Sequence, residues 1–190
     1  MSEVYYTIND VKGWVHNIIR AMNNDGWRPD YIVGLNRGGL VPAVMLSHYL
    51  DITLHTLNVS LRDFSVNSSG PESNLWMAED AFGYVPHKDN VLPASVDRIA
   101  SSPAFRKNIL IVDDINDSGA TLNWIKEDWP AGCLPNESAI WNNVWGNNVR
   151  FAALINNEAS SFKNISYVGK YINKVENDEW CVFPWEEWWR

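Results

Sequence analysis

The chain has 190 residues, 46% of them hydrophobic and 20% charged, which suffices to bury one substantial core and is short for two domains. Its formal net charge of -8 argues against a protein that coats nucleic acid, because that affinity comes from many Lys and Arg side chains that neutralise phosphates. We therefore expect one domain over residues 1–190, with no nucleic acid among its partners.

The cysteine content and the apolar runs indicate the compartment. Cys133 and Cys181 are too few for a disulfide framework and lack the paired spacing of a structural zinc site, which fits a reducing cytosol. No apolar run approaches the ~20 residues that span a bilayer, and residues 1–10 contain no apolar signal-peptide core. We expect a cytoplasmic protein without a membrane partner.

The first predicted element is a helix. Residues 7–10 (Thr-Ile-Asn-Asp) fit a capping box, and apolar side chains then recur at helical spacing over residues 11–22. A short buried strand is predicted over residues 31–35, followed by a Gly-rich turn and an apolar helix over about residues 40–49. The strand, the turn and this second helix form a β-loop-α unit.

Three further strands are predicted, over residues 52–59, 109–112 and 149–155. Helical stretches fall between several of them, and strands that alternate with helices favour parallel pairing. We therefore predict an α/β fold with a mainly parallel, doubly wound sheet.

Two regions do not follow this alternation. Over residues 60–106 the periodicity dissolves into Ser, Asn, Gly, Pro and charged residues, a stretch too long for a routine connection. We interpret it as a mobile loop or lid; a disordered insertion explains its centre equally well, although Trp76, Phe82 and Tyr84 indicate that parts of it pack. Four of the eleven Trp residues lie within residues 180–189, which predicts a C-terminal tail folded against another surface.

The segment after the third predicted strand carries the most chemistry. Residues 109–112 run directly into Asp113 and Asp114, at the carboxyl end of a central strand, where open α/β sheets bind ligands. The turn 117–121 (Asp-Ser-Gly-Ala-Thr) then offers hydroxyls and backbone N–H groups just before a helix that begins near Leu122, an arrangement that can hold a phosphate monoester. Carboxylates accept hydrogen bonds from a cis-diol and position Mg²⁺, so the two features together fit ribose 5-phosphate.

Either half of this segment alone is an ordinary helix cap or turn. Together, in one uninterrupted stretch, they resemble the signature for phosphoribosyl pyrophosphate (PRPP) in the type I phosphoribosyltransferase family. The resemblance implies that Asp113 and Asp114 hold the ribose hydroxyls and bind Mg²⁺, and that both act with Asp117 in catalysis. The PRPP-binding set that it implies comprises Arg37, Gly38, Asp113, Asp114, Asp117, Ser118, Gly119, Ala120 and Thr121.

A second segment, residues 33–43, places Arg37 and two Gly at a strand-to-helix turn. Consecutive glycines allow close backbone approach to an anion, although such turns also serve close packing alone. In context the segment resembles the family's pyrophosphate-binding loop, with Arg37 and Gly38 at the matching positions.

The third segment is residues 179–186, where one aromatic side chain could stack on a flat heterocycle. In isolation, a Trp-rich packing cluster is the better interpretation. In context it resembles the C-terminal hood of xanthine/guanine/hypoxanthine phosphoribosyltransferases, which predicts a hood and tail over residues 156–190. The resemblance implies that Trp180 stacks on the base and that Cys181 contributes its main chain to the base edge. It also implies that Asp117 lies near N7 of the purine as general acid or base.

One departure from the family pattern concerns the base. Purine members usually place a Lys near the end of the strand before the hood, where it reaches the six-position oxygen of the base. Here that strand ends in Asn156, Asn157 and Glu158. An Asn amide can donate to a carbonyl oxygen but is short and uncharged, so Asn157 is the candidate base-binding residue and leaves the choice of base open. Lys163, in the next loop, is an alternative donor.

The resemblance implies transfer of the phosphoribosyl group from PRPP to a ring nitrogen of a 6-oxopurine, with Mg²⁺ as cofactor. The products would be a nucleoside monophosphate and pyrophosphate. A lid over residues 60–106 would exclude water, with Arg62 available to reach pyrophosphate. The alternatives are a non-catalytic PRPP or nucleotide sensor and a pyrimidine phosphoribosyltransferase. A homodimer with the Trp-rich tail as its interface is also compatible with the sequence.

Overall fold

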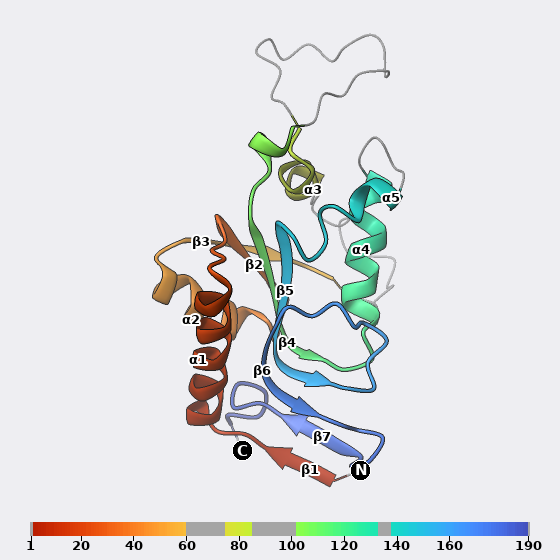
Figure 1. The fold of residues 1–190 in the computed structure, drawn as a ribbon. Helices are drawn as coiled ribbons and strands as arrows, with labels where there is room; N and C mark the ends of the chain where they lie inside the picture. The colour runs from red at the N-terminus through yellow and green to blue at the C-terminus, as the bar shows by residue number, and fades with distance from the viewer. Residues whose placement is uncertain (1, 60–74, 85–101, 133–137, 190) are drawn as a thin grey trace.

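A five-stranded sheet forms the centre of the molecule, with the strand order β3-β2-β4-β5-β6 (Figure 1). The computed structural model describes residues 2–59, 75–84, 102–132 and 138–189. The strands are β2 (Tyr31–Leu35), β3 (Thr53–Leu57), β4 (Ile109–Asn116), β5 (Val149–Asn157) and β6 (Tyr167–Ile172). All neighbouring pairs are parallel, so the carboxyl ends of the strands lie at one edge of the sheet.

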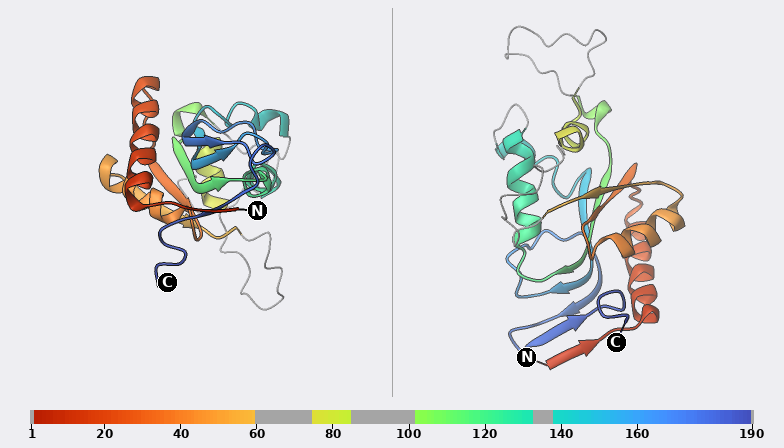
Figure 2. Two further views of the ribbon diagram at one scale, coloured as in Figure 1. Left: turned by 90° about the horizontal axis from the view of Figure 1, so that it is seen from below. Right: turned by 180° about the vertical axis from the view of Figure 1, so that it is seen from behind.

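Helices cover both faces of this sheet (Figure 2). One face carries α1 (Ile8–Asp25) and α2 (Leu40–Leu50), and the other carries α3 (Leu75–Phe82), α4 (Ala120–Gly132) and α5 (Ser138–Trp141). Along β4, Ile111 packs into the core under α3 and α4, whereas Leu110 and Val112 pack into the core under α1 and α2. Burial on both faces explains why these strands are continuous apolar runs, and the predicted doubly wound α/β fold is confirmed.

The start of α1 follows the predicted capping box. The Thr7 hydroxyl accepts a hydrogen bond from the backbone N–H of Asp10 at 3.2 Å, and the Asp10 carboxylate accepts one from the backbone N–H of Thr7 at 2.7 Å. Two of the N–H groups at this end of α1 are thereby satisfied. At the other end Gly26 adopts a left-handed conformation with φ of 62°, which ends the helix.

Several element boundaries differ from the prediction. β4 continues to Asn116, so Asp113 and Asp114 lie within the strand rather than after it. α4 begins at Ala120, two residues before the expected Leu122, so the end of the 117–121 turn is already helical. The longer strand is stabilised by pairing with β5, which itself continues to Asn157.

A second, two-stranded sheet lies beyond the carboxyl ends of the central strands (Figure 1). Here β1 (Ser2–Tyr5) pairs in parallel with β7 (Glu179–Val182), and we call this pair the hood sheet. The N-terminal strand was not predicted. Tyr6 follows it and packs edge-on against Trp14 of α1 at a centroid distance of 4.8 Å, which joins the hood sheet to the body.

Part of the predicted lid is a folded element. Within residues 60–106 the structure describes α3 and a short 3₁₀ turn (Pro103–Phe105). Phe82 of α3 is buried against Trp141, and Trp76 packs near Tyr31, at centroid distances of 5.3 and 5.7 Å. Residues 60–74, which include Arg62, and residues 85–101 lie outside the described residues, so the role of the region as a lid stays a prediction.

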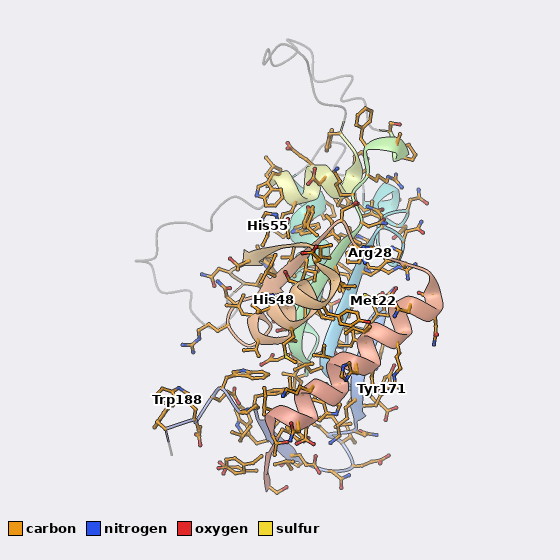
Figure 3. The ribbon with its side chains drawn as sticks, turned by 90° about the vertical axis from the view of Figure 1, so that its left-hand side faces the viewer. Met22, Arg28, His48, His55, Tyr171 and Trp188 are labelled. Carbon is orange, nitrogen blue, oxygen red and sulfur yellow. The ribbon has the colours of Figure 1, made fainter. Side chains whose placement is uncertain are left out.

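The Trp-rich tail is only partly folded against the body. Trp185 stacks on Phe183 at 4.8 Å with an interplanar angle of 11°. Trp188 and Trp189 are 76% and 66% exposed, and Trp188 projects away from the helices (Figure 3). Among the described helices, none combines the length and apolar character that a membrane span requires.

Candidate active site

The two carboxylates of β4 are fixed by the strand's own backbone. The Asp114 N–H donates to Asp113 Oδ1 at 3.0 Å, and the Ile115 N–H donates to Asp114 Oδ1 at 2.8 Å. Both side chains are partly buried near the carboxyl end of the central strand. This edge of an open parallel sheet is where ligands bind, and the predicted pair lies there.

Burial raises the pKa of both groups. Desolvation, aided by the neighbouring charge of Asp114, raises the pKa of Asp113 well above its usual range. Desolvation also raises the pKa of Asp114 to about 6, against hydrogen bonds that favour its ionised form, and the carboxylate of Glu186 adds to the rise. Glu186 follows the hood sheet and belongs to the third sequence segment.

The same pair fits a divalent cation. Among the described residues, no cluster of three or more His, Cys, Asp or Glu side chains forms a complete metal site. Mg²⁺ often takes only one or two carboxylates from the protein and completes its octahedron with water and substrate oxygens. Asp113 and Asp114 supply such hard oxygen donors, and a bound cation would offset the unfavourable desolvation of their charges.

The Arg37 loop lies directly against these carboxylates. A Cβ atom on Gly38 would overlap the Asp114 carboxylate, and one on Gly39 would lie 2.9 Å from the Cα atom of Asp113. Only glycine fits at either position, so the absence of side chains allows the loop and β4 to approach this closely. Arg37 is exposed, and its peptide bond with Asn36 is cis. The structure thus brings the first and second sequence segments together.

The loop that follows β5 supports the 117–121 turn. Gly119 has a φ of 86°, and a Cβ atom there would lie 2.7 Å from the hydroxyl oxygens of Ser160 and Ser161. Ser161 donates to the carbonyl of Ser118 from its backbone N–H at 3.0 Å and from its hydroxyl at 2.7 Å. Ser118 and Ala120 stay exposed at the start of α4, where backbone N–H groups can receive a phosphate. The Ala120 N–H donates to the Ser118 hydroxyl at 3.3 Å.

Asp117 is contacted by two side chains from later in the chain. Its Oδ1 accepts a hydrogen bond from Asn157 Nδ2 at 3.2 Å, and its Oδ2 accepts one from Lys174 Nζ at 2.8 Å. The backbone N–H of Lys174 in turn donates to Asn157 Oδ1 at 3.1 Å. The predicted residues Asp117 and Asn157 are therefore in contact, and both are tied to Lys174.

The hood sheet supplies the other side of the site. Lys174 Nζ lies 5.9 Å from the centre of the Trp180 ring, and that ring is 44% exposed. Cys181 is buried, its Sγ 4.0 Å from the Tyr6 hydroxyl. Burial raises the pKa of the Cys181 thiol, and the charge of Lys174 opposes that rise. The Lys174 amine thus lies between Asp117 and the Trp180 ring.

Lys174 is the residue that sequence reasoning missed. The alternative donor, Lys163, points elsewhere, since its Nζ donates to the carbonyl of Glu158 at 2.7 Å. Lys174 stands in a polar connection after β6, 57 residues from Asp117. No local pattern distinguishes it from other surface lysines, so only the folded arrangement reveals the contact.

Comparison with known proteins agrees with this geometry. The family model described as phosphoribosyl transferase domain matches residues 4–188. The chain is 28% identical over 167 residues to the xanthine-guanine phosphoribosyltransferase of Cereibacter sphaeroides, with 86% of this chain and 72% of that protein covered. It is 24% identical over 198 residues to the hypoxanthine-guanine phosphoribosyltransferase of Schizosaccharomyces pombe, with 96% and 88% covered.

A solved structure extends the comparison to the fold. The purine phosphoribosyltransferase from Pyrococcus horikoshii aligns with a TM-score of 0.60 at 26% identity, over 98% of this chain and 96% of that one. The region matched by the family model contains all three segments that converge on the site. The chain therefore belongs to the phosphoribosyl transferase domain family and is an enzyme of the pentosyltransferase type.

Proposed function

We propose that this enzyme transfers the 5-phosphoribosyl group of PRPP to a ring nitrogen of a 6-oxopurine base. The observation that carries the proposal is the position of Asp117. It lies just past the end of β4, the strand that carries both carboxylates, and Lys174 lies between it and the aromatic ring of Trp180. A base stacked on Trp180 would lie beside Asp117 and face a sugar held by β4. The similarity to xanthine-guanine and hypoxanthine-guanine phosphoribosyltransferases supports an oxopurine.

The sugar phosphate would bind along the edge of the sheet. Asp113 and Asp114 accept hydrogen bonds from the ribose hydroxyls, and the start of α4 receives the 5-phosphate on its backbone N–H groups. Arg37, exposed on the loop beside Asp114, contacts the pyrophosphate.

The chemical step forms a bond from the base nitrogen to C1′ of the ribose. The bond from C1′ to pyrophosphate breaks, and its electron pair leaves with the pyrophosphate. Asp117 accepts the proton that the base gives up as its ring nitrogen is alkylated. Arg37 stabilises the charge on the leaving group. Asp113 and Asp114 would hold Mg²⁺ together with PRPP oxygens, and the cation would supply further positive charge there.

The test is pyrophosphate release from PRPP and Mg²⁺, with guanine, hypoxanthine, xanthine, adenine and orotate offered separately. We expect release with at least one oxopurine. Asp117→Ala should lower the rate by about 10²- to 10⁴-fold, because a positioned general base contributes about that much. Glu127→Ala is the matched control, since Glu127 is exposed on α4, and it should keep the wild-type rate.

Each alternative function has its own outcome in this assay. Release with orotate alone would identify a pyrimidine enzyme. Tight PRPP binding by calorimetry, without release from any base, would replace the proposed transfer by the sensor function.

A further inference from the structure

A buried asparagine, Asn116, ends β4 and directly precedes the 117–121 turn. It is 2% exposed and lies in register with Asn156 of β5. Its Nδ2 donates to Asn156 Oδ1 at 2.7 Å and to the carbonyl of Phe162 at 3.1 Å, and its Oδ1 accepts from the Ser160 hydroxyl at 2.9 Å. Burying an amide is unfavourable unless it is hydrogen-bonded, and these three bonds satisfy it.

The directions of these hydrogen bonds are fixed by backbone groups. The carbonyl of Phe162 can only accept, so the amide nitrogen of Asn116 faces it. The backbone N–H of Phe162 can only donate, and it donates to the Ser160 hydroxyl at 3.2 Å, which leaves the hydroxyl proton for Asn116 Oδ1. Asn116 therefore binds both ends of residues 160–162, and it needs a donor and an acceptor to do so.

Residues 160–162 lie directly against the turn. A Cβ atom on Gly119 would overlap the backbone nitrogen of Phe162 and lie 2.7 Å from the hydroxyl oxygen of Ser160. Ser161, between them, makes the two hydrogen bonds to the carbonyl of Ser118. The contacts thus close a ring that runs from Asn116 through residues 160–162 to Ser118, two residues further along the chain.

We propose that Asn116 is a positioning residue for the 5-phosphate of PRPP. Through residues 160–162 it holds the backbone of Ser118 and Gly119, so that the N–H groups at the start of α4 are already arranged for the phosphate. A preorganised site binds an anion more tightly because less order has to be imposed on binding. This inference rests on the proposed phosphoribosyl transfer and adds the residue that preorganises its phosphate site.

The other parts of the substrates are held by different contacts. The Arg37 loop is positioned by Gly38 and Gly39, which pack against Asp114 and Asp113. The proposed base site belongs to the hood sheet, which pairs β1 with β7. Loss of the Asn116 hydrogen bonds should therefore weaken the binding of one part of PRPP, the 5-phosphate, and spare pyrophosphate and the base.

The test compares Asn116→Leu with Asn148→Leu. Asn148 is a matched control because it is also buried and its Nδ2 also donates to two oxygens, the carbonyls of Ala81 and Lys107, but it precedes β5 at the opposite end of that strand. Calorimetry with Mg²⁺ would measure the affinities for PRPP, ribose 5-phosphate and pyrophosphate. It gives the number of sites separately from the affinity, so a loss of folded protein lowers the first and leaves the second unchanged.

We expect Asn116→Leu to weaken the binding of ribose 5-phosphate and PRPP by about 10- to 100-fold, because displacing a positioned group by about 1 Å costs up to that much. Its affinity for pyrophosphate should stay within about twofold of wild type, because that site is held independently. Asn148→Leu should lose stability in urea but keep all three affinities. In turnover, the KM for PRPP should rise in Asn116→Leu while the KM for the base stays unchanged.

Ser160→Ala is the second variant, which decides the question where Asn116→Leu is too unstable to purify. It removes only the hydroxyl that donates to Asn116. We expect it to weaken ribose 5-phosphate binding by about 3- to 10-fold, the usual effect of losing one neutral hydrogen bond, with pyrophosphate binding unchanged.

The inference and the transfer reaction fail in different ways. Wild-type affinity for ribose 5-phosphate in both variants overturns the role of Asn116, and so does an equal loss of ribose 5-phosphate and pyrophosphate binding; the transfer reaction then still stands on pyrophosphate release by the wild type. A wild-type chain that binds ribose 5-phosphate but releases no pyrophosphate with any base refutes the transfer reaction, while a loss of ribose 5-phosphate affinity confined to Asn116→Leu and Ser160→Ala still supports the positioning. A wild-type chain that does not bind ribose 5-phosphate overturns the inference.

Discussion

Asp114 is placed to bind a cation and substrate, but burial of its charge destabilises the fold. Burial raises its pKa from 3.8 to about 6, so the native state holds the proton more tightly than the unfolded chain does. A carboxyl group with a raised native pKa favours folding below its unfolded pKa, and this contribution is lost as the pH rises through the native pKa. Near pH 7 the ionised carboxylate therefore destabilises the protein until a cation and substrate bind to it.

Asp114→Asn should stabilise the protein at neutral pH. A shift of about two pKa units corresponds to about 2.7 kcal/mol, and we expect a gain of about 1–2 kcal/mol in the free energy of unfolding, because rearranged hydrogen bonds offset part of it. The gain should shrink as the pH falls from 7 to 4.5, where the wild-type carboxyl is protonated in the native state. Urea unfolding at both pH values measures this difference.

Ligand binding provides the control for that prediction. PRPP with Mg²⁺ should raise the Tm of the wild type and leave the Tm of Asp114→Asn nearly unchanged, since the variant lacks one of the two carboxylates that hold them. A variant that is less stable than wild type at both pH values would contradict the view that burial of this charge opposes folding.

At the scale of elements, the sequence predicts those strands whose faces are both covered. β2, the first half of β4 and most of β5 are continuous apolar runs between helices, and their positions are confirmed. β1 and β6 were missed because their sequences, SEVY and YVGKYI, mix polar, charged and glycine residues and have one exposed or weakly packed side. Their strand conformation comes from pairing with distant segments, which no local pattern encodes.

The residues of the site are likewise of two kinds: those that the sequence predicts and those that only the fold reveals. Asp113, Asp114 and the 117–121 turn are contiguous, so a single stretch of sequence is enough to identify them. Lys174, after β6, reaches Asp117, after β4, because β5 pairs with both of these strands. The Ser161 loop, after β5, supports Ser118 because β4 and β5 lie side by side. Contacts that depend on strand order become visible only in the folded chain.

The pairing of β1 with β7 in the hood sheet predicts that the N-terminal strand contributes to base binding. Val4 of β1 is in register with Cys181 of β7, next to Trp180, and packs against the core under α1. Val4→Asp should loosen β7 and raise the KM for the base by about tenfold, since loss of a partly buried valine costs about 1–2 kcal/mol. The KM for PRPP should change by less than about twofold, because PRPP binds to the central sheet.

Steady-state kinetics with each substrate varied in turn measures this split. Glu3→Gln, on the neighbouring and more exposed position of the same strand, should leave both KM values unchanged. An equal rise of both KM values in Val4→Asp would indicate a change that extends beyond the hood, whereas a lower apparent kcat with both KM values unchanged would indicate loss of folded enzyme.

At the scale of the whole molecule, both cores share the central sheet, and the hood sheet packs into one of them. Cys181 and Phe183 belong to the same buried cluster as Val112 and Leu154 of the central strands. This continuity supports the single domain over residues 1–190 that we propose. The cytoplasmic location stays a prediction.

The exposed end of the tail bears on how copies of the chain assemble. Trp188 and Trp189 contact each other edge-on at a centroid distance of 5.9 Å, and both are largely exposed. Figure 3 shows Trp188 at the hood end of the molecule. Trp is enriched at protein interfaces because it buries a large area at a low cost in conformational entropy. We predict a homodimer in which this pair contributes to the interface.

Sedimentation equilibrium tests this prediction. Replacing both Trp188 and Trp189 by Ser should shift the wild-type dimer toward monomer, whereas Tyr49→Ser, which removes an exposed aromatic ring at the end of α2, should leave the dimer intact. Since the tail follows directly after Glu186, whose charge reaches Asp114, dimerisation through the tail would also restrain the hood over the substrate. The double variant should then show a higher KM for the base as it becomes monomeric. A wild-type chain that sediments as a monomer at all concentrations tested would show that the two Trp side chains serve no contact between copies.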